Sequence, residues 1–130
     1  MALILLIDDD SKIREVLRQI LEHAGHEVME ASDGKEGLSL YRKRPPDLVV
    51  TDIVMPKKDG LETITDLRIE FPGSKIIAIS GGGRLDPKLY LELAEGFGAD
   101  HLLTKPFGHE ELLEAVQDLL GRSDTRFKVL

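Results

Sequence analysis

The chain has 130 residues, and its 17 lysines and arginines against 24 aspartates and glutamates give it a formal net charge of -7. A domain of this length folds without disulfides or a structural metal, and the absence of cysteine excludes disulfides, thiolate zinc sites and cysteine nucleophiles. The negative charge disfavours binding to nucleic acid and to anionic membranes, and because we find neither a signal peptide nor an apolar stretch of roughly 20 residues, we expect a cytoplasmic protein.

Five short runs that contain apolar residues predict β-strands. In chain order they lie at 3–7, 26–30, 47–51, 75–79 and 102–104. The first, third and fourth runs are almost continuous in Val, Ile and Leu, which is typical of strands that are buried on both faces of a parallel sheet.

A segment of helical periodicity follows each predicted strand. The apolar faces of these five helices lie, in chain order, within 13–21, 38–41, 64–71, 90–97 and 112–120. Their predicted caps are Asp10 with Ser11, the capping boxes Asp33 with Glu36 and Asp59 with Glu62, and Asp86-Pro87, and the predicted stops are Gly25, Pro72-Gly73 and Gly121. The strict alternation predicts an α/β fold of the (βα)5 type, with a parallel sheet, right-handed crossovers and helices on both faces.

Polar residues follow four of the predicted strands, at the sheet edge where such folds bind ligands. They are Asp8, Asp9 and Asp10 after the first strand, Asp52 after the third, Ser80 after the fourth and Lys105 after the fifth. Clustered carboxylates repel one another, and Mg²⁺ is the cation that one or two carboxylates and a phosphate oxygen usually hold. A carboxylate can accept a phosphoryl group, and a metal, a hydroxyl and an ammonium together stabilise that transfer. The residues therefore indicate phosphoryl chemistry.

Five stretches in this order resemble the receiver domain of two-component response regulators. They are 6–10, 47–60, 79–81, 98–100 and 104–107. The resemblance covers residues 3 to about 121. It implies the doubly wound, flavodoxin-like and CheY-like arrangement with strand order 2-1-3-4-5, a receiver domain over 1–121 and a short C-terminal tail or linker stub at 122–130.

The resemblance also implies a metal site. By that resemblance Asp9 and Asp52 would bind Mg²⁺ directly, Asp8 mostly through water, and the backbone carbonyl of Val54 would be a further ligand. Asp10 lies beside this set, but we interpret it as a helix cap.

In the same resemblance Asp52 is the phosphoacceptor, Ser80 the switch hydroxyl and Lys105 the lysine that contacts the phosphoryl group. The Lys105-Pro106 peptide bond is expected to be cis. The phosphoryl group would come from a histidine kinase or a histidine phosphotransfer protein, so the chain would be a signalling switch and not an enzyme. It would signal through the loop after the fourth strand and the face of the fourth helix, fifth strand and fifth helix, to a downstream protein or an output domain outside this sequence.

The chain departs from the family pattern in two features. Leu102 occupies the place of the aromatic residue that many receivers rotate on activation, so we expect the response to appear mainly in the loop 81–85 and the helix after it. Of the charged residues that pair in the dimers of winged-helix regulators, only Asp100 and Glu111 remain, both acidic. We therefore expect no salt-bridged dimer of that kind.

Two alternatives share parts of the pattern. A haloacid-dehalogenase-like phosphatase has a D-x-D motif after its first strand, which Asp8 and Asp10 match, and Asp8 would then be the nucleophile. That family needs a further acidic pair downstream and a longer core. A flavodoxin-like flavin carrier holds a phosphate in its first loop, which three aspartates would repel.

Overall fold

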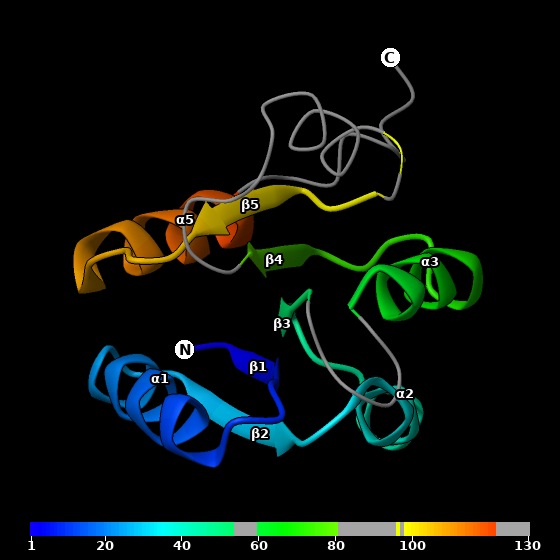
Figure 1. Ribbon diagram of the computed structural model, residues 1–130, viewed down its shortest axis with the longest axis horizontal. Helices are drawn as coiled ribbons and strands as arrows, with labels where there is room; N and C mark the ends of the chain where they lie inside the picture. Colours follow the sequence, from blue (N-terminus) through cyan, green and yellow to red (C-terminus); the bar gives the residue numbers. More distant parts are fainter. Residues whose placement is uncertain (54–59, 81–95, 97, 122–130) are drawn as a thin grey trace.

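A five-stranded parallel sheet lies at the centre of the structure, a computed structural model that describes residues 1–53, 60–80, 96 and 98–121. Its strands are β1 Leu3–Ile7, β2 Glu27–Ala31, β3 Leu48–Asp52, β4 Ile76–Ser80 and β5 His101–Thr104. The sheet order is β2-β1-β3-β4-β5 with every pair parallel, which confirms the predicted class and strand order (Figure 1).

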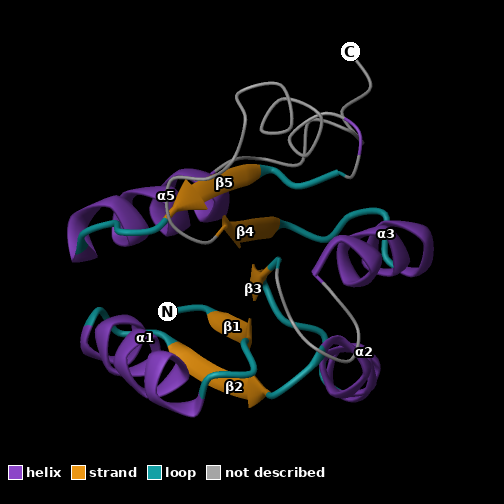
Figure 2. Ribbon diagram, in the orientation of Figure 1, coloured by secondary structure: helices purple, strands orange, loops and turns teal. Residues whose placement is uncertain are grey.

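Helices cover both faces of this sheet. They are α1 Ser11–His23, α2 Gly34–Lys43, α3 Gly60–Glu70 and α5 His109–Gly121. Helices α1 and α5 lie on one face and α2 and α3 on the other (Figure 2). The helix predicted after Asp86 lies outside the described residues. Among the helices that are described, none is long and apolar enough to cross a membrane.

The strand ends differ by one residue from the prediction at several places. β1 is as predicted, whereas β2, β3 and β4 begin and end one residue later and β5 begins one residue earlier. Asp52 and Ser80 are therefore the last residues of their strands, paired with Ile79 and Thr104. Backbone pairing depends on the neighbouring strand and not on side-chain polarity, so a polar side chain does not mark the last paired residue.

The predicted caps of the first two helices form, with one difference. The Asp10 side chain accepts hydrogen bonds from the backbone N–H groups of the first turn of α1. The Asp33 side chain accepts from Glu36 N at 2.8 Å, but the Glu36 carboxylate accepts from Ser32 N and not from Asp33 N. The hydrogen bond from Glu36 N to Asp33 is thus as predicted, whereas the reciprocal hydrogen bond comes from the residue before the predicted one. The cap at Asp59 lies outside the described residues.

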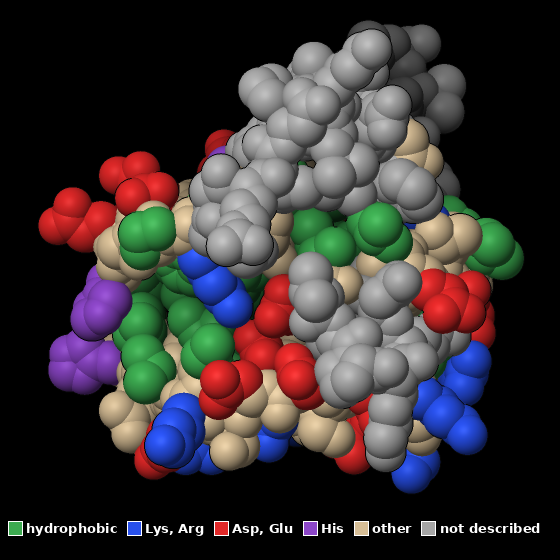
Figure 3. Space-filling view, viewed as in Figure 1, with side chains coloured by type: hydrophobic (Ala, Val, Ile, Leu, Met, Phe, Trp, Pro, Cys, Tyr) green, Lys and Arg blue, Asp and Glu red, His purple; other side chains and the backbone are tan. Residues whose placement is uncertain are grey.

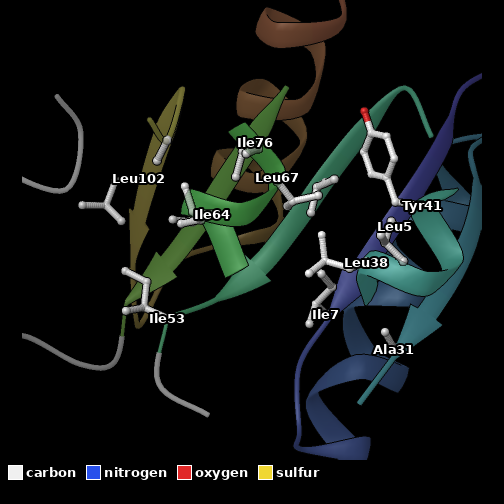
Figure 4. Close-up of a cluster of buried hydrophobic side chains, with 13 residues drawn as sticks. Leu5, Ile7, Ala31, Leu38, Tyr41, Ile53, Ile64, Leu67, Ile76 and Leu102 are labelled. Carbon is white, nitrogen blue, oxygen red and sulfur yellow. The ribbon is translucent and has the colours of Figure 1, made fainter. Parts of the chain in front are cut away.

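Hydrophobic side chains pack against both faces of the sheet. β1 contributes to both, because Leu5 and Ile7 face α2 and α3 whereas Ile4 and Leu6 face α1 and α5, and all four are fully buried. Figure 4 shows the cluster on the α2 and α3 side, which includes Leu102. This two-sided burial is the arrangement that the continuous apolar run predicts, and it leaves the strand ends free to carry polar groups.

Candidate functional site

Three carboxylates meet at the carboxyl ends of β1 and β3. One oxygen each of Asp8, Asp9 and Asp52 lies within 4.8 Å of the others. β1 and β3 are hydrogen-bonded neighbours, and this pairing brings together residues more than forty positions apart in sequence. Figure 3 shows acidic side chains gathered near the centre of this face of the molecule. Asp8 and Asp52 are buried, whereas Asp9 is exposed to solvent.

Asp8 is the most enclosed member of this acidic cluster, at 1% exposure. The pKa of Asp8 is raised to about 6, mainly by burial and also by the nearby charges of Asp52 and Asp9. The hydrogen bond from Asp10 N and the charge of Lys105 act in the opposite direction. Within the described part of the chain, its second oxygen Oδ2 has no hydrogen-bond partner. A buried acceptor left open in this way suits a cation or a cation-bound water.

Lys105 and Ser80 complete the group at the same sheet edge. The Nζ atom of Lys105 lies 3.6 Å from Oδ2 of Asp52. Ser80 is 2% exposed, and its Oγ has no hydrogen-bond partner among the described residues. The backbone N–H of Lys105 donates to the Ser80 carbonyl at 3.0 Å, so the ends of β4 and β5 are held together. The Lys105-Pro106 bond is cis, as expected.

The structure thus gathers Asp8, Asp9, Asp52, Ser80 and Lys105, which the sequence singled out separately. Asp10 does not join them, because its side chain caps α1. Val54, the predicted carbonyl ligand, lies outside the described residues. Oxygen donors of this kind suit a hard divalent cation such as Mg²⁺.

Arg14 contacts the acidic cluster, which the sequence analysis did not predict. From the second turn of α1, its Nη1 donates to the backbone carbonyl of Asp8 at 2.6 Å, and its Nε pairs with Glu30 on β2 at 3.2 Å. An arginine on an amphipathic helix is an ordinary surface residue by pattern. Only the position of α1 against the ends of β1 and β2 reveals the contact.

Comparison with known proteins agrees with this geometry. The family described as the response regulator receiver domain matches residues 4–117. The transcriptional regulatory protein CpxR of Klebsiella pneumoniae is 38% identical over 120 residues, which are 92% of this chain and 50% of that protein. The chemotaxis protein CheY of Halobacterium salinarum is 36% identical over 117 residues, which are 90% of this chain and 95% of that protein.

A solved structure of a receiver domain has the same fold as this chain. The response regulator receiver domain protein of Clostridium thermocellum superposes with a TM-score of 0.86 at 32% identity, covering 98% of this chain and all of that chain. The chain spans about half the length of CpxR. The matched region contains the acidic cluster, Ser80 and Lys105. The chain therefore belongs to the response regulator receiver domain family, whose members are signalling switches of two-component systems.

Proposed function

We propose that Asp52 accepts a phosphoryl group from the phosphohistidine of a histidine kinase or phosphotransfer protein. A carboxylate oxygen of Asp52 attacks phosphorus, the P–N bond breaks with its electron pair on the imidazole nitrogen, and an acyl phosphate forms. The observation that carries this proposal is the position of Asp52. It is the last residue of β3, with two further carboxylates and an ammonium around it.

Lys105 and Ser80 would hold the transferred group. The Lys105 ammonium, already beside the Asp52 carboxylate, would pair with phosphoryl oxygens as a point charge. The Ser80 hydroxyl is buried without a partner among the described residues, and it would donate a hydrogen bond to a phosphoryl oxygen. Both groups act by neutralising and orienting charge, which is the main requirement of phosphoryl transfer.

The residues fit Mg²⁺, which receiver domains bind at an acidic aspartate cluster. Asp9 and Asp52 would be direct ligands, Asp8 would act mostly through water, and the Val54 carbonyl would be a further ligand. The open Oδ2 of the buried Asp8 supports this fit. When bound, Mg²⁺ supplies positive charge that stabilises the phosphoryl oxygens during transfer.

We further propose that the chain works in the cytoplasm and that its receiver unit covers 1–121. The output would pass to a downstream protein or to an output domain joined after 122–130. CpxR, by its name a transcriptional regulator, supports this arrangement, because this chain matches only half of its length.

The experiment is phosphorylation by acetyl phosphate with Mg²⁺, followed by mapping of the modified residue by mass spectrometry. We expect the phosphate on Asp52, and we expect Asp52→Asn to abolish it. Asp118→Asn, which removes an exposed carboxylate on α5, is the matched control and should label normally. Labelling of Asp8 would instead support the phosphatase alternative, which the enclosed position of Asp8 disfavours.

A further inference from the structure

We infer that Arg14 is a positioning residue for the acidic cluster. Its guanidinium holds the peptide group that joins Asp8 to Asp9, and so sets the directions of both carboxylates for cation binding. The inference deepens the proposed function and rests on it. It is carried by a chain of contacts that runs from α1 through β2 to the end of β1.

The first contact is on the Asp8 backbone. Arg14 Nη1 donates to the Asp8 carbonyl at 2.6 Å, and the Arg14 side chain is only 17% exposed. That carbonyl belongs to the peptide unit between Asp8 and Asp9, which is planar. Holding its oxygen therefore also fixes the N–H of Asp9 and the direction in which the chain leaves Asp8.

The second contact prevents the guanidinium from turning away. Arg14 Nε pairs with Glu30 Oε1 at 3.2 Å, and Arg18 Nη1 pairs with the other oxygen, Glu30 Oε2, at 2.7 Å. The Glu30 side chain is 28% exposed, so its pairing is partly shielded from water. The planar guanidinium reaches both the Asp8 carbonyl and Glu30 with separate N–H groups, which a lysine ammonium does not offer in the same geometry.

The other hydrogen bonds of Asp8 use its N–H and its side chain, whereas Arg14 binds its carbonyl. The Asp8 N–H donates to the Ala31 carbonyl at 3.1 Å, and Asp8 Oδ1 accepts from Asp10 N at 2.9 Å. Among the hydrogen bonds of the described residues, the Arg14 bond is the one from a side chain to the Asp8 backbone. Without the Arg14 hydrogen bond, the peptide group between Asp8 and Asp9 would lose the side chain that sets its orientation, while the other hydrogen bonds of Asp8 would remain.

The sign of the effect separates positioning from simple electrostatics. Arg14 brings a positive charge close to the carboxylates, so by Coulomb's law its removal should strengthen cation binding. A positioning role predicts the reverse. Removal should weaken binding, because the ligands lose their arrangement, and groups that orient metal ligands typically contribute about 10-fold or more to affinity.

The test measures Mg²⁺ alone, titrated into the full chain and followed through the amide resonances of residues 8–10. We expect Arg14→Gln to weaken Mg²⁺ affinity by about 10-fold and Arg14→Lys to weaken it as well, although the charge is kept. The matched control is Arg18→Gln. It removes a charge from the same helix and a pairing to the same Glu30, but it does not contact the Asp8 carbonyl, and it should leave the affinity unchanged or slightly higher.

Thermal unfolding without Mg²⁺ provides the second readout. Arg14 and Arg18 both pair with Glu30, so a purely structural role predicts parallel losses of stability and equal affinities. The inference would be overturned if Arg14→Gln bound Mg²⁺ as tightly as the wild type or more tightly. It would also be overturned if Arg18→Gln weakened Mg²⁺ binding as much as Arg14→Gln. If Arg14→Gln does not fold, Arg14→Lys decides by the same criterion. A wild-type chain that shows no saturable response to Mg²⁺ would overturn the proposed metal site, and this inference with it.

Discussion

The Lys105 ammonium lies 3.6 Å from Oδ2 of Asp52, although β4 separates the strands to which the two residues belong. The Asp52 side chain is 9% exposed and that of Lys105 28%, so the pair is largely shielded from water. The distance is longer than an N–H···O hydrogen bond, so the two groups are paired by charge and not by a hydrogen bond. The ammonium is nevertheless close enough to contact a phosphoryl group on Asp52.

Replacing Lys105 tests this relationship. We expect Lys105→Ala to slow the phosphorylation of Asp52 by acetyl phosphate on the order of 100-fold, because a charge aimed at the transferred group is lost. The rate is measured by mass spectrometry over time at fixed Mg²⁺. Lys75→Ala, at the opposite end of the sheet before β4, is the control and should react at the wild-type rate. Equal rates in the two variants would exclude a role for Lys105.

Asp8 makes the metal-free fold depend on pH. Its pKa of about 6 in the folded state lies above the value of 3.8 for a free side chain, so the folded chain keeps a proton that the unfolded chain releases. The free energy of unfolding should therefore fall as pH rises from 4 to 6. Each pKa unit corresponds to about 1.4 kcal/mol, which sets an upper limit of about 3 kcal/mol for this loss.

Asp8→Asn should remove this dependence. In chemical denaturation with a chelator, the variant should match the wild type near pH 4 and exceed it by up to about 3 kcal/mol at pH 7. Asp118→Asn removes one charge from an exposed position and serves as the control for net charge. A stability difference between Asp8→Asn and the wild type that does not change with pH would contradict the prediction.

Ser80 should be important for ligand binding but not for stability. Because its buried Oγ has no hydrogen-bond partner among the described residues, Ser80→Ala should leave the free energy of unfolding unchanged or raise it by about 1 kcal/mol. The same variant should bind beryllium fluoride, a phosphoryl mimic, more weakly, whereas Ser80→Thr should restore binding because it restores the hydroxyl. If Ser80→Ala lost stability but bound beryllium fluoride normally, Ser80 would be a structural residue and not a phosphoryl-binding one.

Leu102 should matter for packing and not for the response to phosphorylation. It is 6% exposed and belongs to the cluster on the α2 and α3 side, so Leu102→Ala should lower the free energy of unfolding by about 2–5 kcal/mol. The amide shifts that beryllium fluoride causes in residues 81–90, which lie outside the described part of the chain, should nevertheless persist. Leu102→Met, which nearly keeps the volume, is the control for stability. Loss of those shifts in a folded Leu102→Ala sample would show coupling through β5.

Asp100 is engaged within its own chain. Its Oδ2 pairs with Arg68 on α3 and accepts from Ile76 N at 2.8 Å. A carboxylate held in this way is not free to pair with a second copy, so the phosphorylated chain should not form the salt-bridged dimer of the winged-helix regulators. Sedimentation combined with mapping of the contacts checks this. A tight dimer with contacts mapped to Asp100 and Glu111 would contradict this prediction.

Much of the fold was predictable from local patterns. The apolar run of β1 predicted burial on both faces because successive side chains of a strand point to opposite sides. The alternation of such runs with helical segments predicted a parallel sheet. Asp8, Asp52, Ser80 and Lys105 were recognisable because a polar residue at the end of a buried strand lies at the ligand-binding edge of such a sheet.

Other features depended on contacts between distant segments. Arg14 reaches the Asp8 carbonyl only because α1 packs across the ends of β1 and β2, and Arg68 reaches Asp100 only because α3 lies beside the start of β5. The raised pKa of Asp8 depends on its burial, and the last residues of β3 and β4 depend on their neighbouring strands. Residue type and spacing report what one segment can bury, whereas hydrogen bonds, ion pairs and desolvation depend on which groups the folded chain brings together.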